Sequence, residues 1–159
     1  MYSKGEVVVY PMHGACVIQD FEEKTIDGIV KNYCVLELPL GNLTIMLSQD
    51  CMPSAGLRSI MSETEITKIV KRACNASSKV RTDGVNSQQK HKEHIEKMKT
   101  GKLCDSASVF YELYQKEKTK GLSGAEKKTM TTAKKIVMSE IMLGMNFSKE
   151  EAEAMVEKP

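Results

Sequence analysis

Short apolar runs separated by turn residues make up the first third of the chain. β-Branched, aromatic and aliphatic residues gather at positions 7–10, 15–18, 33–38 and 43–47. Between them lie residues typical of turns: Pro11 and Gly14, the Asp27-Gly28 pair, and positions 39–42. This pattern predicts four or five short strands, which within roughly fifty residues is typical of a small SH3-like or Tudor-like β-barrel.

A barrel of this size has too little interior for a substrate cavity, so a docking role is favoured. If the sheet is not fully closed, it leaves an edge strand whose N–H and C=O groups can pair with a strand of another protein. The alternative for residues 33–47 is an ordinary hairpin with no binding role.

From Ser62 onward the apolar positions follow helical spacing. A serine stands three positions before a glutamate at 62–65, 123–126 and 148–151, and this capping box predicts a helix start. Helix ends are predicted near Gly101 and Gly121, and the polar residues 75–86 predict a connector. The residues that line the helical faces are Ile66, Ile69, Val70, Ala73, His91, Ile95, Met98, Val109, Phe110, Leu113, Tyr114, Met130, Ala133, Val137, Met138, Ile141 and Met142.

These two patterns predict an α+β fold. Residues 1–52 form the small SH3/Tudor-like β-barrel, and residues 53–159 form an all-α domain of five helices, with the seam at positions 52–56.

Charge divides the chain in the same way. The formal net charge is +2, but residues 1–52 hold three basic and seven acidic residues, net −4. Residues 53–159 therefore hold twenty basic and fourteen acidic residues, net +6, and positions 68–135 alone hold seventeen basic against seven acidic, net +10. Positive charge at this density favours a polyanion such as nucleic acid. A well-solvated, lysine-rich helical surface explains it equally well.

The cysteines and the beginning of the chain indicate a reducing cellular compartment. Cys16, Cys34, Cys51, Cys74 and Cys104 are odd in number and scattered, with no CxxC pair, so we expect reduced and mostly buried residues. The first residues lack the layout of a signal peptide, and no apolar run reaches membrane-spanning length. We therefore expect a cytoplasmic protein with no membrane attachment.

The sequence contains no recognisable motif for catalysis or metal binding. His91 and His94 share a helix face, but without an HExxH pattern or a nearby cysteine they predict ordinary helix residues rather than zinc ligands. His13 lies in a predicted turn, where a structural role is favoured. Phosphate-binding glycine loops and a nucleophile elbow are absent from the sequence. We therefore expect no catalytic residue, no metal or other cofactor, and no small-molecule substrate.

Two motifs in a fixed order carry a resemblance to a known family. Residues 8–15 are Val-Val-Tyr-Pro-Met-His-Gly-Ala, and residues 121–128 are Gly-Leu-Ser-Gly-Ala-Glu-Lys-Lys. With these motifs the chain resembles the CarD/CdnL family of bacterial RNA-polymerase-binding transcription regulators. Residues 33–47 look like the central hairpin of that family, and residues 95–101 are similar to the end of its second helix, so the likeness covers nearly the whole chain.

The resemblance implies two binding domains. Residues 1–52 would be a Tudor-like domain that binds the RNA polymerase β subunit, and residues 53–159 a basic helical domain that contacts promoter DNA near the upstream edge of the transcription bubble. Such a protein modulates the stability of the open complex by binding one state better than another, and it associates with the nucleoid through the polymerase. The implied polymerase contacts are Lys24, Thr25, Ile26, Thr44, Ile45 and Met46.

Two departures from the family pattern concern these contacts. Family members often carry arginine at the positions of Lys24 and Met46, so we expect a more apolar contact at Met46. The family also commonly has a tryptophan followed by arginines at the start of the second helix, whereas this chain has no tryptophan and places Ser87 at or next to that position. The implied DNA contacts are Ser87, Gln89, Lys90, Lys92, Lys97, Lys127 and Lys128.

The missing tryptophan changes the expected mode of DNA contact. A flat indole can wedge against an unstacked base, and base–aromatic stacking is worth roughly 1–3 kcal/mol, but serine cannot do this. We therefore predict salt-dependent contact with the DNA backbone and weak or absent wedging. Three functions stay open: a regulator that bridges polymerase and promoter DNA, a polymerase-docking module that does not engage DNA, and a general nucleic-acid binder without polymerase contact.

Overall fold

The chain folds into an antiparallel sheet followed by helices, as the sequence pattern predicts. The computed structural model describes residues 2–77 and 87–159. The sheet is open, with strand order β4-β3-β2-β1-β5, so that β4 and β5 are its two edges. Its strands are β1 (Val7–Tyr10), β2 (Gly14–Ile26), β3 (Ile29–Glu37), β4 (Thr44–Ser48) and β5 (Arg58–Ser59), with a 3₁₀ helix, η1 (Gln49–Ser54), before β5.

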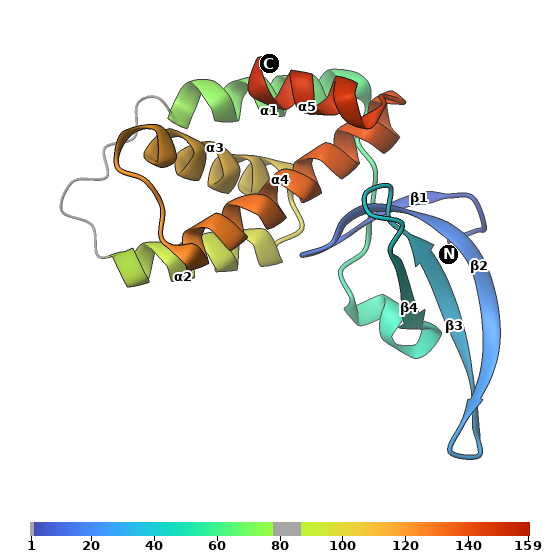
Figure 1. Ribbon diagram of the computed structural model, residues 1–159. Coiled ribbons are helices and arrows are strands. Elements are labelled where there is room, and N and C mark those ends of the chain that lie inside the picture. The colour runs from blue at the N-terminus through green and yellow to red at the C-terminus, as the bar shows by residue number, and fades with distance from the viewer. Residues whose placement is uncertain (1, 78–86) are drawn as a thin grey trace.

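In the part of the chain that the structure describes, five α-helices follow the open sheet, so the predicted α+β architecture of a Tudor-like module and a helical module is confirmed. They pack around one core, to which Tyr111, Phe110 and Leu113 contribute fully buried side chains. Figure 1 shows α3 and α4 in the middle of the bundle, with α1 on one side and α2 on the other. The helices are α1 (Glu63–Ser77), α2 (Ser87–Lys99), α3 (Leu103–Thr119), α4 (Gly124–Met145) and α5 (Lys149–Glu157).

The predicted capping boxes begin three of the helices. Ser123 and Ser148 each accept a hydrogen bond from the backbone N–H of the glutamate three residues later, and that glutamate accepts one from the serine N–H. Ser62 Oγ accepts from Glu65 N at 3.3 Å before α1. Helix α1 continues to Ser77, so the predicted connector at 75–86 begins too early. The rest of that connector, residues 78–86, lies outside the described residues.

The β2–β3 hairpin is longer than the sequence pattern predicts. Asp27 and Gly28 connect its strands with φ values of +53° and +76°, the two positive values that a type I′ turn requires. Residues 22–32, which we call the hairpin arm, are all exposed. The arm projects away from the rest of the molecule (Figure 1). Polar residues occupy both faces of the arm, so it lacks the alternation by which a half-buried strand is recognised.

The sheet and the bundle meet where the β1–β2 turn contacts α4. Gly14 packs against Ile136 and Ser139 of α4, and the Ala15 N–H donates to Ser139 Oγ at 2.9 Å. Beside this contact, Arg58 of β5 forms two hydrogen bonds, 2.8 and 3.0 Å long, to the buried carboxylate of Glu140 in α4. The Arg58 Nε–H also donates to the Gly101 carbonyl at 2.7 Å. These hydrogen bonds therefore hold the β1–β2 turn and β5 against α4, and β5 against the segment that follows α2.

The division at residues 52 and 53 stays a prediction. The predicted seam falls on η1 and on the segment that leads to β5, and β5 pairs with β1 through Val8↔Ser59 and Val9↔Arg58.

The cysteines differ from expectation in their burial. All five are free, but only Cys16 and Cys34 are buried, whereas Cys51 and Cys104 are exposed. The expectation of mostly buried thiols is therefore wrong, because Cys51 lies in the superficial helix η1 and Cys104 on the exposed side of α3. Burial raises the pKa of Cys16 to about 12, which keeps that thiol protonated.

Residues 2–77 and 87–159 contain neither a helix suited to span a membrane nor a cluster suited to hold a metal ion. None of their helices is long and apolar enough to cross a membrane. In the same residues, no three His, Cys, Asp or Glu side chains gather closely enough to hold a metal ion.

Candidate functional site

The strand register assigns each residue of the hairpin arm to one face of the sheet. Residues paired directly across an antiparallel ladder share a face, and faces alternate along each strand. Cys34 and Leu36 of β3 belong to the core of the sheet, and so do their partners Leu47 and Ile45 in β4. The odd-numbered residues of β3 therefore lie on the opposite face, which we call the outer face.

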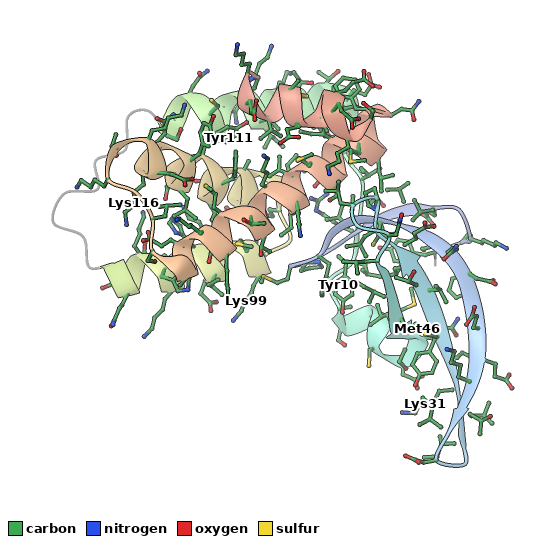
Figure 2. All side chains as sticks on the ribbon, in the orientation of Figure 1. Tyr10, Lys31, Met46, Lys99, Tyr111 and Lys116 are labelled. Carbon is green, nitrogen blue, oxygen red and sulfur yellow. The ribbon has the colours of Figure 1, made fainter. Side chains whose placement is uncertain are left out.

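Four of the six predicted polymerase contacts lie on the outer face. Lys24 pairs with Lys31, and Ile26 pairs with Ile29, so Lys24 and Ile26 share the face of these odd-numbered β3 residues. Met46 and Thr44 pair with Val35 and Glu37 and lie on the same face. Figure 2 shows Met46 nearer the bundle and Lys31 farther out along the arm.

The other two predicted contacts lie on the opposite face. Ile45 is half-buried and packs against the core of the sheet. Thr25 pairs with Val30, so both point away from the outer face of the arm. The register also adds Ile29 and Lys31, which the sequence analysis missed. Their positions beside the Asp27-Gly28 turn could have revealed them, because a two-residue turn fixes which residues pair.

Near the turn, the outer face of the arm combines apolar and basic side chains, whereas Glu22, the partner of Tyr33, lies at its base. Ile26 and Ile29 are 54% and 57% exposed, which is unusual for large apolar residues. Lys24 and Lys31 stand directly opposite each other, and neither forms an ion pair with any described residue. Two like charges in this position repel each other, so the face is suited to a partner that supplies carboxylates.

A second candidate surface lies where α2 and α4 begin. A pocket of about 350 Å³ between these helix starts is lined by Gln88, His91, Lys92, Ser123, Ala125 and Glu126. Figure 1 shows both starts at the end of the bundle farthest from the sheet. Lys127 and Lys128 follow Glu126 directly and are exposed. Lys92 of α2 and the start of α4 therefore line one pocket, and Lys127 and Lys128 follow that start along α4.

The predicted DNA contacts differ in how free their charges are. Among the ion pairs between described residues, Lys90 pairs with Glu93 and Glu112, whereas Lys92, Lys127 and Lys128 form none. Lys97 is half-buried without such a pair, and Gln89 is exposed. Ser87 is the first residue of α2, but its side chain lies outside the described part of the chain. The free positive charge is therefore concentrated at Lys92, Lys127 and Lys128.

Two acidic residues beside this surface are already paired with basic groups. Burial would raise the pKa of Glu112, but its hydrogen bond with His94 and the charges of Lys90 and Lys97 outweigh burial and lower it. Burial would likewise raise the pKa of Glu126, but hydrogen bonds from Lys116 and from the Ser123 N–H hold it below its ordinary value. Figure 2 places Lys116 at the end of the bundle far from the sheet. Both carboxylates are thus ionised but already paired.

His94 holds α2 against α3. Its Nε2 lies 2.8 Å from Glu112 Oε2, and its side chain is buried. His94 is therefore a buried residue that joins two helices. His91 lies apart from this pair and lines the pocket between α2 and α4, where it contributes the one ring among the described lining residues.

Comparison with known proteins gives two matches to family models. Residues 2–61 match the CarD-like/TRCF RID domain, and residues 75–157 match the C-terminal domain of CarD. The chain is also 30% identical over 142 residues to a Bacillus subtilis (strain 168) protein named "Putative transcription factor YdeB". That alignment covers 89% of this chain and 90% of the relative.

Proposed function

This chain belongs to the CarD/CdnL family of bacterial transcription regulators, and from that premise we propose that it joins RNA polymerase to promoter DNA. The observation that carries the proposal is the outer face of the hairpin arm, where exposed apolar residues and unpaired lysines stand side by side. The basic surface at the starts of α2 and α4 lies at the opposite end of the molecule (Figure 1). A protein with binding surfaces at both ends can hold two partners at once.

The polymerase surface comprises Lys24, Ile26, Ile29, Lys31, Thr44 and Met46. Its partner is the β subunit, and the docking strand edge is β4, which pairs on one side only with β3. Apolar burial supplies most of the affinity, because full burial of one large aliphatic side chain is worth about 1.5–3 kcal/mol. Lys24 and Lys31 form ion pairs with carboxylates of the partner, and these pairs fix the orientation in which the partner binds. At Met46 the thioether packs rather than forming an ion pair.

Ile29 and Val30 provide a matched test of this surface. Both are 57% exposed and adjacent in sequence, but they lie on opposite faces of the arm. Ile29→Asp is expected to weaken binding of the full chain to purified β subunit at least tenfold, because a buried carboxylate would face the interface, whereas Val30→Asp leaves binding nearly unchanged. Biolayer interferometry measures both. Equal losses in the two variants would rule out the outer face as the docking surface.

The DNA surface consists of Lys92, Lys127 and Lys128, with Gln89, Lys90, Lys97 and Ser87 around them. Lysine ammonium groups attract phosphates and release counterions from the DNA, so the contact is insensitive to sequence and strongly dependent on salt. The pocket between α2 and α4 contains no indole among its lining residues, and His91 supplies a smaller ring. We therefore propose that backbone contact outweighs base stacking in this protein.

The salt dependence of DNA binding tests this part of the proposal. In a titration of open-fork promoter DNA with the full chain, Lys127→Gln together with Lys128→Gln is expected to reduce the slope of log K against log salt by about 2, since each lost phosphate contact removes about 0.9. The control is Lys68→Gln with Lys71→Gln, two exposed lysines of α1 on the other side of the bundle (Figure 1). If the unsubstituted chain shows no salt-sensitive binding, the docking module without DNA contact is the function.

The proposed effect on transcription follows from holding both partners together. The protein binds most tightly to the state of the promoter complex in which polymerase and the DNA beside the bubble contact their surfaces at the same time. This differential binding changes the lifetime of the open complex. No bond is made or broken in the process. The site of action is the cytoplasm, on polymerase at the nucleoid.

A further inference from the structure

A groove of about 700 Å³ runs between the sheet and the bundle, apart from both surfaces described above. One wall is the β3–β4 turn, residues 38–43, and the other is α4 from Met130 to Met138 together with the beginning of α5. The wall residues come from segments nearly one hundred positions apart, so no run of sequence reveals the groove.

The floor of the groove is apolar. Leu40, Pro39 and Met130 are half-buried there, and Leu43 is 58% exposed. Met138 also lines the groove and is buried. A flexible thioether adapts to the shape of an incoming side chain, which makes methionine common in surfaces that bind peptides.

The rim of the groove is basic. Lys134, Lys135 and Lys149 line it, and among the described lining residues Glu153 supplies the one carboxylate. Lys134 Nζ forms an ion pair with Glu153 Oε1 at 2.9 Å. In the described part of the chain, Lys135 and Lys149 form no ion pair, and both are exposed. Two ammonium groups are therefore available beside an apolar floor.

The composition of the lining favours a peptide over nucleic acid. Single strands bind where bases stack on aromatic rings. The described residues that line the groove include no Phe, Tyr or Trp, and His13 supplies the one ring. Aliphatic and methionine side chains instead match the apolar side chains of a peptide, and the free lysines match its carboxylates.

The walls of the groove are fixed in place before any partner binds. The sheet is held to α4 by the hydrogen bond from Ala15 to Ser139 and by the Arg58–Glu140 pair. Gly14 packs directly against α4 beside them. A preformed groove loses little conformational freedom on binding, which favours affinity for a short segment.

We propose that this groove binds a short segment of a protein partner in which apolar side chains alternate with aspartate or glutamate. This goes beyond the proposed function, because neither the outer face of the arm nor the starts of α2 and α4 contribute to the groove. It gives the protein a third contact, placed between the other two.

Fluorescence anisotropy with a labelled peptide tests the proposal. The probe is a twelve-residue peptide of alternating Leu and Glu, compared with the same peptide carrying Lys in place of Glu. The acidic probe is expected to bind the full chain, and Lys135→Glu with Lys149→Glu is expected to weaken it roughly tenfold, since each substitution replaces an attracting ammonium group with a repelling carboxylate. Leu43→Gln removes an exposed apolar contact of the floor and is expected to weaken it severalfold.

Controls separate this site from general attraction between charges. Lys68→Glu with Lys71→Glu makes the same change of net charge on α1 and is expected to leave binding of the acidic probe unchanged. Equal weakening by both pairs, or equal binding of the lysine probe, would overturn the proposal. Tighter binding of a twelve-nucleotide oligothymidine that is lost in the Lys135/Lys149 variant would assign the groove to nucleic acid instead. Self-association of the free chain that Leu43→Gln abolishes in sedimentation would assign it to a second copy.

Discussion

Replacing Gly14 by alanine is expected to lower the free energy of unfolding by about 3 kcal/mol, the sum of backbone strain and overpacking. Gly14 has a φ of +95°, which disfavours any residue with a Cβ. A Cβ at this position would also overlap Ser139 Oγ and lie 3.1 Å from the Ile136 Cα. Ser139 Oγ cannot move away easily, because it accepts a hydrogen bond from the Ala15 N–H and donates one to the Ile136 carbonyl. The Ile136 Cα belongs to the backbone of α4 and cannot move without shifting the helix. Urea denaturation of the two proteins measures the loss.

Gly28→Ala separates the two causes. Gly28 has a comparable φ of +76°, but a Cβ there meets nothing within 4 Å. It therefore carries only the strain of the left-handed backbone, about 1–2 kcal/mol. If Gly14→Ala costs no more than Gly28→Ala, the added Cβ does not overpack the contact between the β1–β2 turn and α4.

Replacing Arg58 by methionine is expected to lower the free energy of unfolding by about 3–4 kcal/mol, because it leaves the Glu140 carboxylate buried without its partner. Glu140 is fully buried, and Arg58 supplies both of its ion-pair hydrogen bonds. The Gly101 carbonyl loses its donor as well. Thermal and urea denaturation at neutral pH measure the effect.

The double variant Arg58→Met with Glu140→Leu is the control for this pair. A buried ion pair often exchanges for apolar residues of similar volume with little loss, so the double variant is expected to recover most of the stability. An additive loss in the double variant would mean that Arg58 acts through its bonds to Gly101 and Ser59 rather than through Glu140.

Local signals in the sequence account for the elements that were predicted correctly. The capping boxes at Ser123 and Ser148 act within three residues, so they can be read without any knowledge of the fold. The Asp27-Gly28 turn is equally local. By contrast, β5 has two residues and exists only because β1 offers it a partner, so no pattern in Arg58-Ser59 predicts it. The end of α1 was predicted too early for a similar reason. Asn75 and Ser77 favour turns by themselves, but here they continue the helix that precedes them.

The candidate surfaces were predictable only in part. The basic character of the helical half is visible as composition, but the pairing of Lys90 with Glu112 joins two helices and depends on how α2 packs on α3. Likewise, the family resemblance implied Thr25 and Ile45 together with Lys24 and Met46, and only the register assigns them to different faces. The Arg58–Glu140 contact spans 82 positions and leaves no trace in either segment.

The exposed hairpin arm also has a consequence for local stability. Residues 22–32 are all exposed, so their ladder is held mainly by main-chain hydrogen bonds, the turn and cross-strand pairs such as Ile26 with Ile29. An isolated two-stranded ribbon is marginal in water, so the arm can fray and re-form without disturbing the sheet at its base. A partner that binds the arm therefore selects the conformation in which both strands are paired. Ordering the arm costs conformational entropy, which reduces the net binding free energy.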